Sequence, residues 1–164
     1  MSFSIPDLHH LRAAQGWLEL GDWQSANDEL ENIAAPMRGH PDVLKLRFAV
    51  YSAAKHWDIA LAVAESLVTI LPDDPHSWIN RSFVLHELER TREAQMLLLP
   101  ALKKFRDEWH VPYNLACYAC QLGQIDMARR LLKRAFFVGD AKSVKLAALA
   151  DPAFAPLWTA EQLK

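Results

Sequence analysis

Gly21-Asp22-Trp23-Gln24-Ser25-Ala26 is the first of four related stretches that decide the fold of this 164-residue chain. The other three are Lys55-His56-Trp57-Asp58-Ile59-Ala60, Glu89-Arg90-Thr91-Arg92-Glu93-Ala94 and Gly123-Gln124-Ile125-Asp126-Met127-Ala128. Their final alanines are each 34 residues apart, and small or apolar residues recur in the same register further along each repeat. Because several columns agree over three equal intervals, the chain is predicted to be a repeat protein.

The apolar residues inside each repeat follow the spacing of an α-helix. In the third repeat they stand three or four positions apart before a turn at 89–91 and resume after it: Trp78, Ser82, Leu85 and Leu88, then Ala94, Leu97, Leu98 and Ala101. Gly21 and Gly123 are predicted to end helices, whereas Pro41 and Pro75 are predicted to begin them. Each repeat is therefore predicted to be two antiparallel helices, with the recurring alanine at their close crossing.

The pattern resembles the tetratricopeptide repeat, a family with the same 34-residue period. The matching residues are Trp78 for the first aromatic, Ala14, Ser82 and Ala116 for the small residue, Trp17 and Tyr51 for the large one, and Pro72 for the closing proline. The resemblance implies an all-α fold, a right-handed α-solenoid of antiparallel helix pairs. We expect one domain over residues 1–164, with units at about 7–40, 41–74, 75–108 and 109–140. A capping segment is expected at 141–164, because the period stops after Gly139.

Departures from the family pattern predict local irregularities. Arg47 and Arg81 occupy a place that is usually aliphatic, so their guanidinium groups are expected to reach outward or to form pairs. Phe48 occupies a place that is usually small, which predicts local repacking. Pro100 lies within the second helix of the third unit, where it removes a backbone donor and clashes with the preceding turn. A kink or an early break is therefore expected between Leu97 and Pro100.

Charge and hydropathy argue against nucleic-acid and membrane binding. The chain has 18 Lys and Arg against 20 Asp and Glu, so it lacks the positive excess that holds a phosphate backbone. No signal peptide and no apolar run long enough to span a membrane is recognisable. These features predict a cytoplasmic protein that binds neither nucleic acid nor membrane.

No constellation of residues indicates catalysis or cofactor binding. Cys117 and Cys120 form the single CxxC pair, and a zinc site would need a second pair of ligands. The seven histidines form no HExxH motif, and neither a GxSxG motif nor a phosphate-binding glycine loop is present. The chain is therefore predicted to have no catalytic residues and to use no metal or cofactor, with both cysteines packed or lining the groove.

Most of the six tryptophans are assigned to packing. Trp17, Trp23, Trp57 and Trp78 fall on large apolar places of the repeat, so we expect them in the core. Trp109 and Trp158 fall outside these places, and their role is left open.

In a stack of helix pairs the first helices line a concave face, the usual binding surface of such arrays. The residues projected onto this groove are Lys45, Ala49, His76, Ile79, Asn80, Phe83, His86, His110, Tyr113, Asn114, Cys117 and Gln121. Because stacking requires no apolar residue there, Ile79, Phe83 and Tyr113 predict a partner site. Alternatively, the closing helix or the N-terminal arm fills the groove. Asn80 and Asn114 either bond a peptide backbone or connect neighbouring helices.

Charge is distributed unevenly along the repeats. Residues 7–40 carry a net charge of −4, and residues 109–164 carry +3. The positive charge is concentrated on the second helix of the last repeat, at Arg129, Arg130, Lys133 and Arg134. This basic surface is either a solvated helix face or a docking surface for an acidic partner or a second copy of the chain.

The predicted function is a non-catalytic scaffold that binds a peptide or helix of a partner protein in the groove. The Lys, Asn and Arg set with which some family members hold a C-terminal carboxylate is missing, so an apolar or amphipathic segment is the expected partner. The alternatives are a small chaperone of a secreted protein and an accessory subunit whose groove binds a small molecule or supports an enzyme. Weak homo-oligomerisation is also left open.

Overall fold

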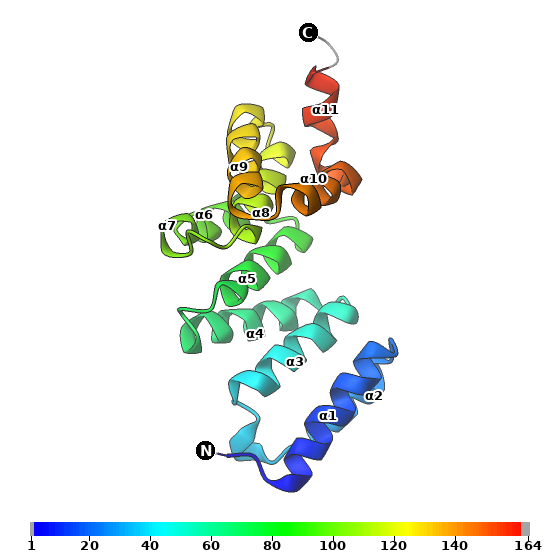
Figure 1. Ribbon diagram of the computed structural model, residues 1–164. Helices are drawn as coiled ribbons and strands as arrows, with labels where there is room; N and C mark the ends of the chain where they lie inside the picture. The colour runs from blue at the N-terminus through cyan, green and yellow to red at the C-terminus, as the bar shows by residue number, and fades with distance from the viewer. Residues whose placement is uncertain (1, 162–164) are drawn as a thin grey trace. The chain divides into compact units, whose positions relative to one another are not determined.

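The computed structural model describes residues 2–161, which form helices and turns without any β-strand among them. The chain divides into two compact units, Met1–Pro72 (unit 1) and Asp73–Lys164 (unit 2) (Figure 1). The prediction of an all-α fold is confirmed. The border between the units lies close to the predicted start of the third repeat at residue 75.

Unit 1 consists of two antiparallel helix pairs (Figure 1). Its elements are α1 (Ile5–Glu19), α2 (Trp23–Glu31), the 3-10 turn η1 (Ala35–Met37), α3 (Pro41–Ala53) and α4 (Trp57–Ile70). Within the pairs, α1 packs on α2 and α3 on α4, while α2 also contacts α3. The first helices of the two pairs, α1 and α3, are therefore neighbours on one side of the unit.

Unit 2 contains two further helix pairs and, after them, residues 141–161, which we call the closing segment. Its elements are α5 (Pro75–Glu87), α6 (Thr91–Leu98), α7 (Ala101–Lys104), α8 (His110–Gln121), α9 (Ile125–Val138), α10 (Ala141–Ala150), η2 (Pro152–Phe154) and α11 (Ala155–Glu161). The pairs are α5 with α6 and α8 with α9, and α5 contacts α8 directly. The predicted capping helix is α10, which packs on α9, while η2 turns back onto α8.

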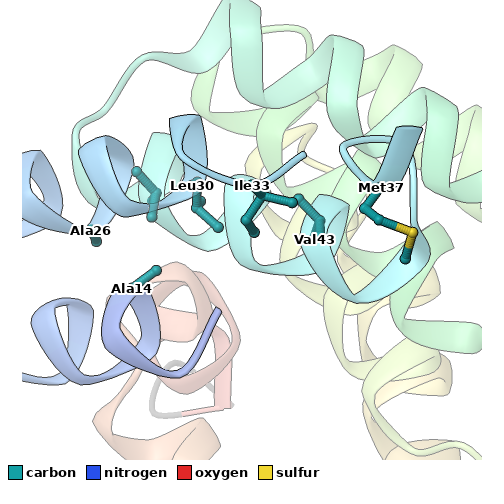
Figure 2. Close-up of a cluster of buried hydrophobic side chains, with 7 residues drawn as sticks. Ala14, Ala26, Leu30, Ile33, Met37 and Val43 are labelled. Carbon is teal, nitrogen blue, oxygen red and sulfur yellow. The ribbon is translucent and has the colours of Figure 1, made fainter. Parts of the chain in front are cut away.

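The recurring alanines lie where the helices of a pair cross. Ala26, Ala60, Ala94 and Ala128 expose no surface, as predicted for small side chains at close helix contacts. In unit 1, Ala26 belongs to a core in which Ala14, Leu30, Ile33, Met37, Val43 and Val50 are also buried (Figure 2). The repeat period therefore encodes the core directly.

The turns inside the pairs share one left-handed residue. Gly21 and Gly123 have φ of 82° and 72°, which confirms the prediction that they end helices. The residues one and two repeats after Gly21 adopt the same conformation without being glycine: Lys55 has φ of 56° and Glu89 has φ of 62°. The backbone geometry of the turn is thus kept even where the side chain opposes it.

Pro100 breaks the second helix of the third repeat, as predicted. Helix α6 ends at Leu98 and α7 begins at Ala101. The break leaves backbone carbonyls to be satisfied by other partners. The Arg81 guanidinium donates to the Leu97 carbonyl at 3.2 Å, and that of Arg134 donates to the Leu102 carbonyl at 2.7 Å. Two arginines from neighbouring helices therefore support the interrupted helix.

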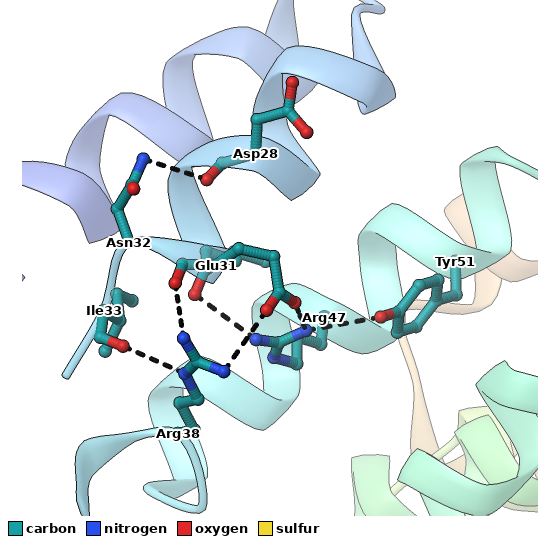
Figure 3. Close-up of polar contacts among 8 residues, drawn as sticks. Asp28, Glu31, Asn32, Ile33, Arg38, Arg47 and Tyr51 are labelled. Atoms are coloured by element: carbon teal, nitrogen blue, oxygen red, sulfur yellow. Dashed lines mark hydrogen bonds and ion pairs between the residues drawn. The ribbon is translucent and has the colours of Figure 1, made fainter. Parts of the chain in front are cut away.

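Arg47 pairs instead of reaching into solvent (Figure 3). Its guanidinium donates to the Glu31 carboxylate at 2.7 Å, to the Tyr51 hydroxyl and to the Leu30 carbonyl at the end of α2. Arg38 donates to the Glu31 and Ile33 carbonyls on the same helix end. Both arginines thus satisfy carbonyls at the end of α2, and Arg47 links α2 to α3.

The prediction that Trp17 lies in the core is wrong, because 40% of this residue is exposed. An indole is too large for the neighbouring helices to cover, whereas the smaller Leu85 and Ala119 are buried at the equivalent places. Trp23, Trp57 and Trp78 are half-buried, and Trp23 packs against the unit 1 core. Phe48 is buried at its unusual place.

Candidate functional site

A cleft lies on the first helices of each unit. In unit 1 a cleft of about 560 Å³ lies between α1 and α3 and is lined by Leu11, Gln15, Leu18, Glu19, Asp42, Lys45 and Leu46. Its leucines are half-buried and pack against the unit 1 core, whereas its charged side chains are exposed. Of the two predicted groove residues in this unit, Lys45 lines the cleft, and Ala49 follows one turn later on α3 without lining it.

The cleft in unit 2 contains five of the predicted groove residues. It has a volume of about 560 Å³ and lies between α5, α8 and the closing segment. The predicted residues in its wall are Phe83, His86, Asn114, Cys117 and Gln121. The wall also includes Glu87, Tyr118, Asp151, Pro152, Ala153 and Pro156. We call this the unit 2 cleft.

The polar side chains on the α5 and α8 side of the unit 2 cleft are held in place by hydrogen bonds. His86 Nδ1 lies 2.9 Å from the Thr91 hydroxyl, and Gln121 Nε2 lies 3.2 Å from His86 Nε2. Because the Gln121 amide nitrogen can only donate, His86 Nε2 accepts and Nδ1 carries the proton that is donated to Thr91. Below them the Tyr118 hydroxyl bonds the buried Ser82 hydroxyl at 3.1 Å.

The closing segment supplies the opposite wall of the cleft. The Asp151 carboxylate accepts from the Tyr113 hydroxyl at 3.1 Å and from the Cys117 thiol at 3.6 Å. It also accepts from the Ala153 backbone N–H at 2.9 Å, which caps η2. The Tyr113 ring packs edge-to-face on the buried Phe154. The described part of the closing segment therefore covers Tyr113 and forms one wall of the cleft.

Burial and the Asp151 charge change the acidity of the groups beneath the carboxylate. Burial first, and then the charge of Asp151, raises the pKa of the Tyr113 hydroxyl and of the Cys117 thiol well above their ordinary values. Burial likewise raises the pKa of the Cys120 thiol to about 11. Both cysteines are free and buried, and they remain neutral thiols at physiological pH.

The remaining predicted residues lie at the α8 start and along α5. Asn114 donates to the His110 carbonyl of its own helix at 2.8 Å. His76 and His110 have ring centroids 6.1 Å apart. His110 also pairs with Glu108, and this contact outweighs burial and lowers the pKa of that carboxyl. Ile79 and Asn80 are half-buried on α5.

Trp109, whose role the sequence left open, packs at the start of α8. Its ring stacks on His110 with centroids 3.7 Å apart and meets Tyr113 edge-on. A Cβ added at Gly139 would come within 2.8 Å of the same ring. Trp109 therefore fills the space where α9 ends and α10 begins.

The basic residues of α9 do not behave as one surface. Arg134 is committed to the Leu102 carbonyl, whereas Arg130 and Lys133 are exposed. Arg129 and Lys133 border a smaller cleft of about 260 Å³ against α11, with Leu132, Phe136, Leu157 and Trp158. Trp158 belongs to α11 and lines this smaller cleft opposite α9.

Sequence reasoning missed the closing-segment side of the unit 2 cleft. Asp151, Pro152, Ala153 and Pro156 follow the last repeat, where the 34-residue period no longer predicts position. The signal that was available is the Asp-Pro pair, because an aspartate before a proline is typical of a turn that begins a new helix. The Asp-Pro pair predicts a turn at this point of the chain, but it does not predict that the turn packs against α8.

The described part of the chain contains neither a cluster of metal-ligating side chains nor a helix that could span a membrane. No group of three or more His, Cys, Asp or Glu side chains is arranged to hold a metal ion among residues 2–158. None of the described helices is long and apolar enough to cross a membrane.

The fold is shared with solved structures of low sequence identity. A crystal structure of MamA matches with a TM-score of 0.74, at 12% identity over 96% of this chain and 81% of that chain. A second MamA structure, designated MSR-1, has a TM-score of 0.68 and 20% identity over 82% and 76% of the two chains. PilF of Pseudomonas aeruginosa has a TM-score of 0.69 and 16% identity over 79% and 60%. No protein-family model and no curated protein sequence matches the chain.

MamA and PilF are both tetratricopeptide-repeat proteins. Together with the 34-residue period and the buried alanines, this likeness shows that the chain has the tetratricopeptide-repeat fold. The resemblance predicted from the sequence is therefore confirmed at the level of fold.

Proposed function

We propose that the chain is a non-catalytic protein-interaction module that holds an extended or helical segment of a partner protein in the unit 2 cleft. The observation that carries the proposal is the exposed residue Phe83, 38% accessible, in a cleft where His86 and Gln121 already bond each other. An apolar side chain beside ordered polar groups is typical of a partner site. The fold of the related scaffold structures supports the same function.

The unit 1 cleft is proposed as a second contact for the same kind of segment. Its half-buried leucines beside the exposed Glu19, Asp42 and Lys45 suit an amphipathic segment. We also propose that the exposed cations of α9 allow weak association between copies, and that the protein works in the cytoplasm.

The test is capture of partners by wild type and by Phe83→Glu. A carboxylate placed at Phe83 is expected to weaken binding at least about tenfold, because it would be desolvated against the segment. The matched control is Met96→Glu, which puts the same charge on a 63% exposed apolar residue outside the cleft. Tyr113 is left unchanged, since its substitution would disturb the closing segment.

Captured proteins are identified by mass spectrometry, and each is then purified and titrated calorimetrically against the three forms. Binding that survives Phe83→Glu in a variant with wild-type circular dichroism overturns the proposal. Turnover of a substrate by the purified chain would overturn the non-catalytic part of it.

A further inference from the structure

We infer that the unit 2 cleft accepts an arginine or lysine side chain of the partner segment, with its cation at Asp151 and Glu87. This inference rests on the proposed function, because it names the chemistry of the segment that the same cleft would hold. It is carried by the charge of the cleft wall, by the way Asp151 is held, and by the apolar residues beside it.

The wall of the cleft is negative. Its titratable side chains include the carboxyl groups of Glu87 and Asp151, and the described residues that line it include neither lysine nor arginine. Both ring nitrogens of His86 are already used by Thr91 and Gln121. A partner carboxylate would meet like charge here, whereas a cation would be attracted.

Asp151 is positioned by neutral donors alone. Its Oδ2 accepts from Tyr113 and Cys117, and its Oδ1 accepts from the Ala153 N–H. No ion pair to Asp151 occurs within the described residues. A carboxylate has about four lone-pair positions, so it keeps room for a further donor. Three hydrogen bonds thus hold the carboxylate in the cleft wall, and no described side chain forms an ion pair with it.

The apolar part of the wall fits the stem of a basic side chain. Phe83 and Tyr118 from the helices and Pro152 and Pro156 from the closing segment line the same cleft as the two carboxyl groups. Arginine and lysine stems pack along apolar surface, and a guanidinium also stacks on an aromatic face. A purely apolar side chain would use the walls but leave Asp151 desolvated without a partner.

The test begins with a random 12-residue peptide library displayed on phage and selected against the full chain. We expect the enriched peptides to share a basic residue. A synthetic peptide of the leading sequence is then titrated by fluorescence anisotropy, together with a version in which norleucine replaces that residue. Loss of the cation is expected to weaken binding by about tenfold, the effect of one charge-assisted hydrogen bond.

Two variants of the chain locate the cation. Asp151→Asn keeps an oxygen for the Ala153 N–H, and Glu87→Gln changes an exposed side chain, so at least one variant is expected to fold as wild type. Each is expected to weaken binding of the basic peptide and not to weaken binding of the norleucine peptide, which has no cation to lose. Asp107→Asn is the matched control, because it removes the same charge from an exposed residue of unit 2 outside the cleft.

The outcomes separate this inference from the proposed function. Enriched peptides that are apolar or acidic, or a basic peptide that binds Asp151→Asn and Glu87→Gln as tightly as wild type, overturn the inference. If Phe83→Glu still abolishes binding in that case, the interaction function stands. Peptides that bind wild type and Phe83→Glu equally, or no enrichment at all, overturn the proposed function and the inference together.

Discussion

Single residues in this chain matter most where the backbone demands an unusual conformation. The turn between the two helices of a pair places one residue at positive φ in each of the four repeats, at positions 21, 55, 89 and 123. Glycine adopts this conformation without steric cost, whereas any other residue brings its Cβ close to the following carbonyl. Lys55 and Glu89 therefore carry strain that Gly21 and Gly123 avoid.

This strain predicts opposite effects for two kinds of substitution. Lys55→Gly is expected to raise the free energy of unfolding by about 0.5–1 kcal/mol, and Gly21→Ala to lower it by about 1 kcal/mol. Gly16→Ala is the control, because Gly16 lies within α1 with no atom near its missing Cβ. This substitution should raise the free energy of unfolding by about 0.5–1 kcal/mol. Urea unfolding followed by circular dichroism measures all three. Equal effects at Gly16 and Gly21 would contradict the argument.

At the scale of elements, the interruption between α6 and α7 is a local effect of one proline. The backbone of Leu99 and Pro100 remains in the helical region, with φ of −54° and −61°. The helix therefore breaks because a donor is missing and the ring crowds the preceding turn, and no sharp bend of the chain is involved.

Pro100→Ala is accordingly expected to join α6 and α7. The restored N–H can donate to the preceding turn of the helix. The free energy of unfolding is expected to rise by about 1–2 kcal/mol, after subtraction of the larger entropy of the unfolded chain. Ellipticity at 222 nm and the urea midpoint should both increase in magnitude. Pro41→Ala serves for comparison, because proline is well tolerated at the first position of α3 and its removal should bring no gain.

The contact between α2 and α3 depends on the ionisation of Glu31. The hydrogen bond from Arg47, together with the charges of Arg47 and Arg38, outweighs burial and lowers the pKa of the Glu31 carboxyl below its ordinary value of 4.5. A lowered folded-state pKa means that the unfolded chain takes up the proton first as pH falls. The stabilisation is therefore complete above pH 4.5 and is lost as pH falls below it.

Glu31→Gln should therefore be less stable than wild type at pH 7, by about 0.2–1 kcal/mol for a half-exposed pair. This difference is expected to shrink as pH falls below 4.5. Urea midpoints measured from pH 7 to pH 3 test it. In an Arg47→Met background the same substitution should have little effect at any pH, because the main cause of the lowered pKa is gone. A difference that widens in acid would contradict the assignment.

At the scale of the whole molecule, charge differs between the two units. Residues 1–72 carry a net charge of −4 and residues 73–164 carry +2. Arg134 is already bonded within unit 2, so Arg130 and Lys133 are the exposed cations of α9 that remain for contact with an acidic surface. Association between copies of the chain would then be electrostatic and weak.

Light scattering tests this association. At about 0.02 M salt the mean mass is expected to exceed that of the monomer, and at about 0.5 M it should return to the monomer value, because screening shortens the range of the attraction. Arg130→Glu combined with Lys133→Glu should abolish the rise at low salt. A monomer mass under both conditions would show that the α9 cations are a solvated helix face.

The sequence by itself determined the helix pairs, the alanines at their crossings, the left-handed turns at the glycines and the break before Pro100. Each of these features depends on a residue and its neighbours in the chain or in the adjacent repeat. They can therefore be predicted from local sequence and the 34-residue period. It also placed Phe83, His86, Asn114, Cys117 and Gln121 on one face, since their spacing along the helices sets their direction.

Only the tertiary structure decided what completes that face. Trp17, which was predicted in the core, is exposed, and Tyr113, which was predicted on the open groove, is covered by Phe154. Asp151 reaches Tyr113 from 38 residues further on, in a segment that no longer repeats. The position of the chain after the last repeat depends on side-chain packing between distant segments. The 34-residue period therefore cannot predict it. The acidic wall of the unit 2 cleft is therefore a product of folding rather than of the repeat.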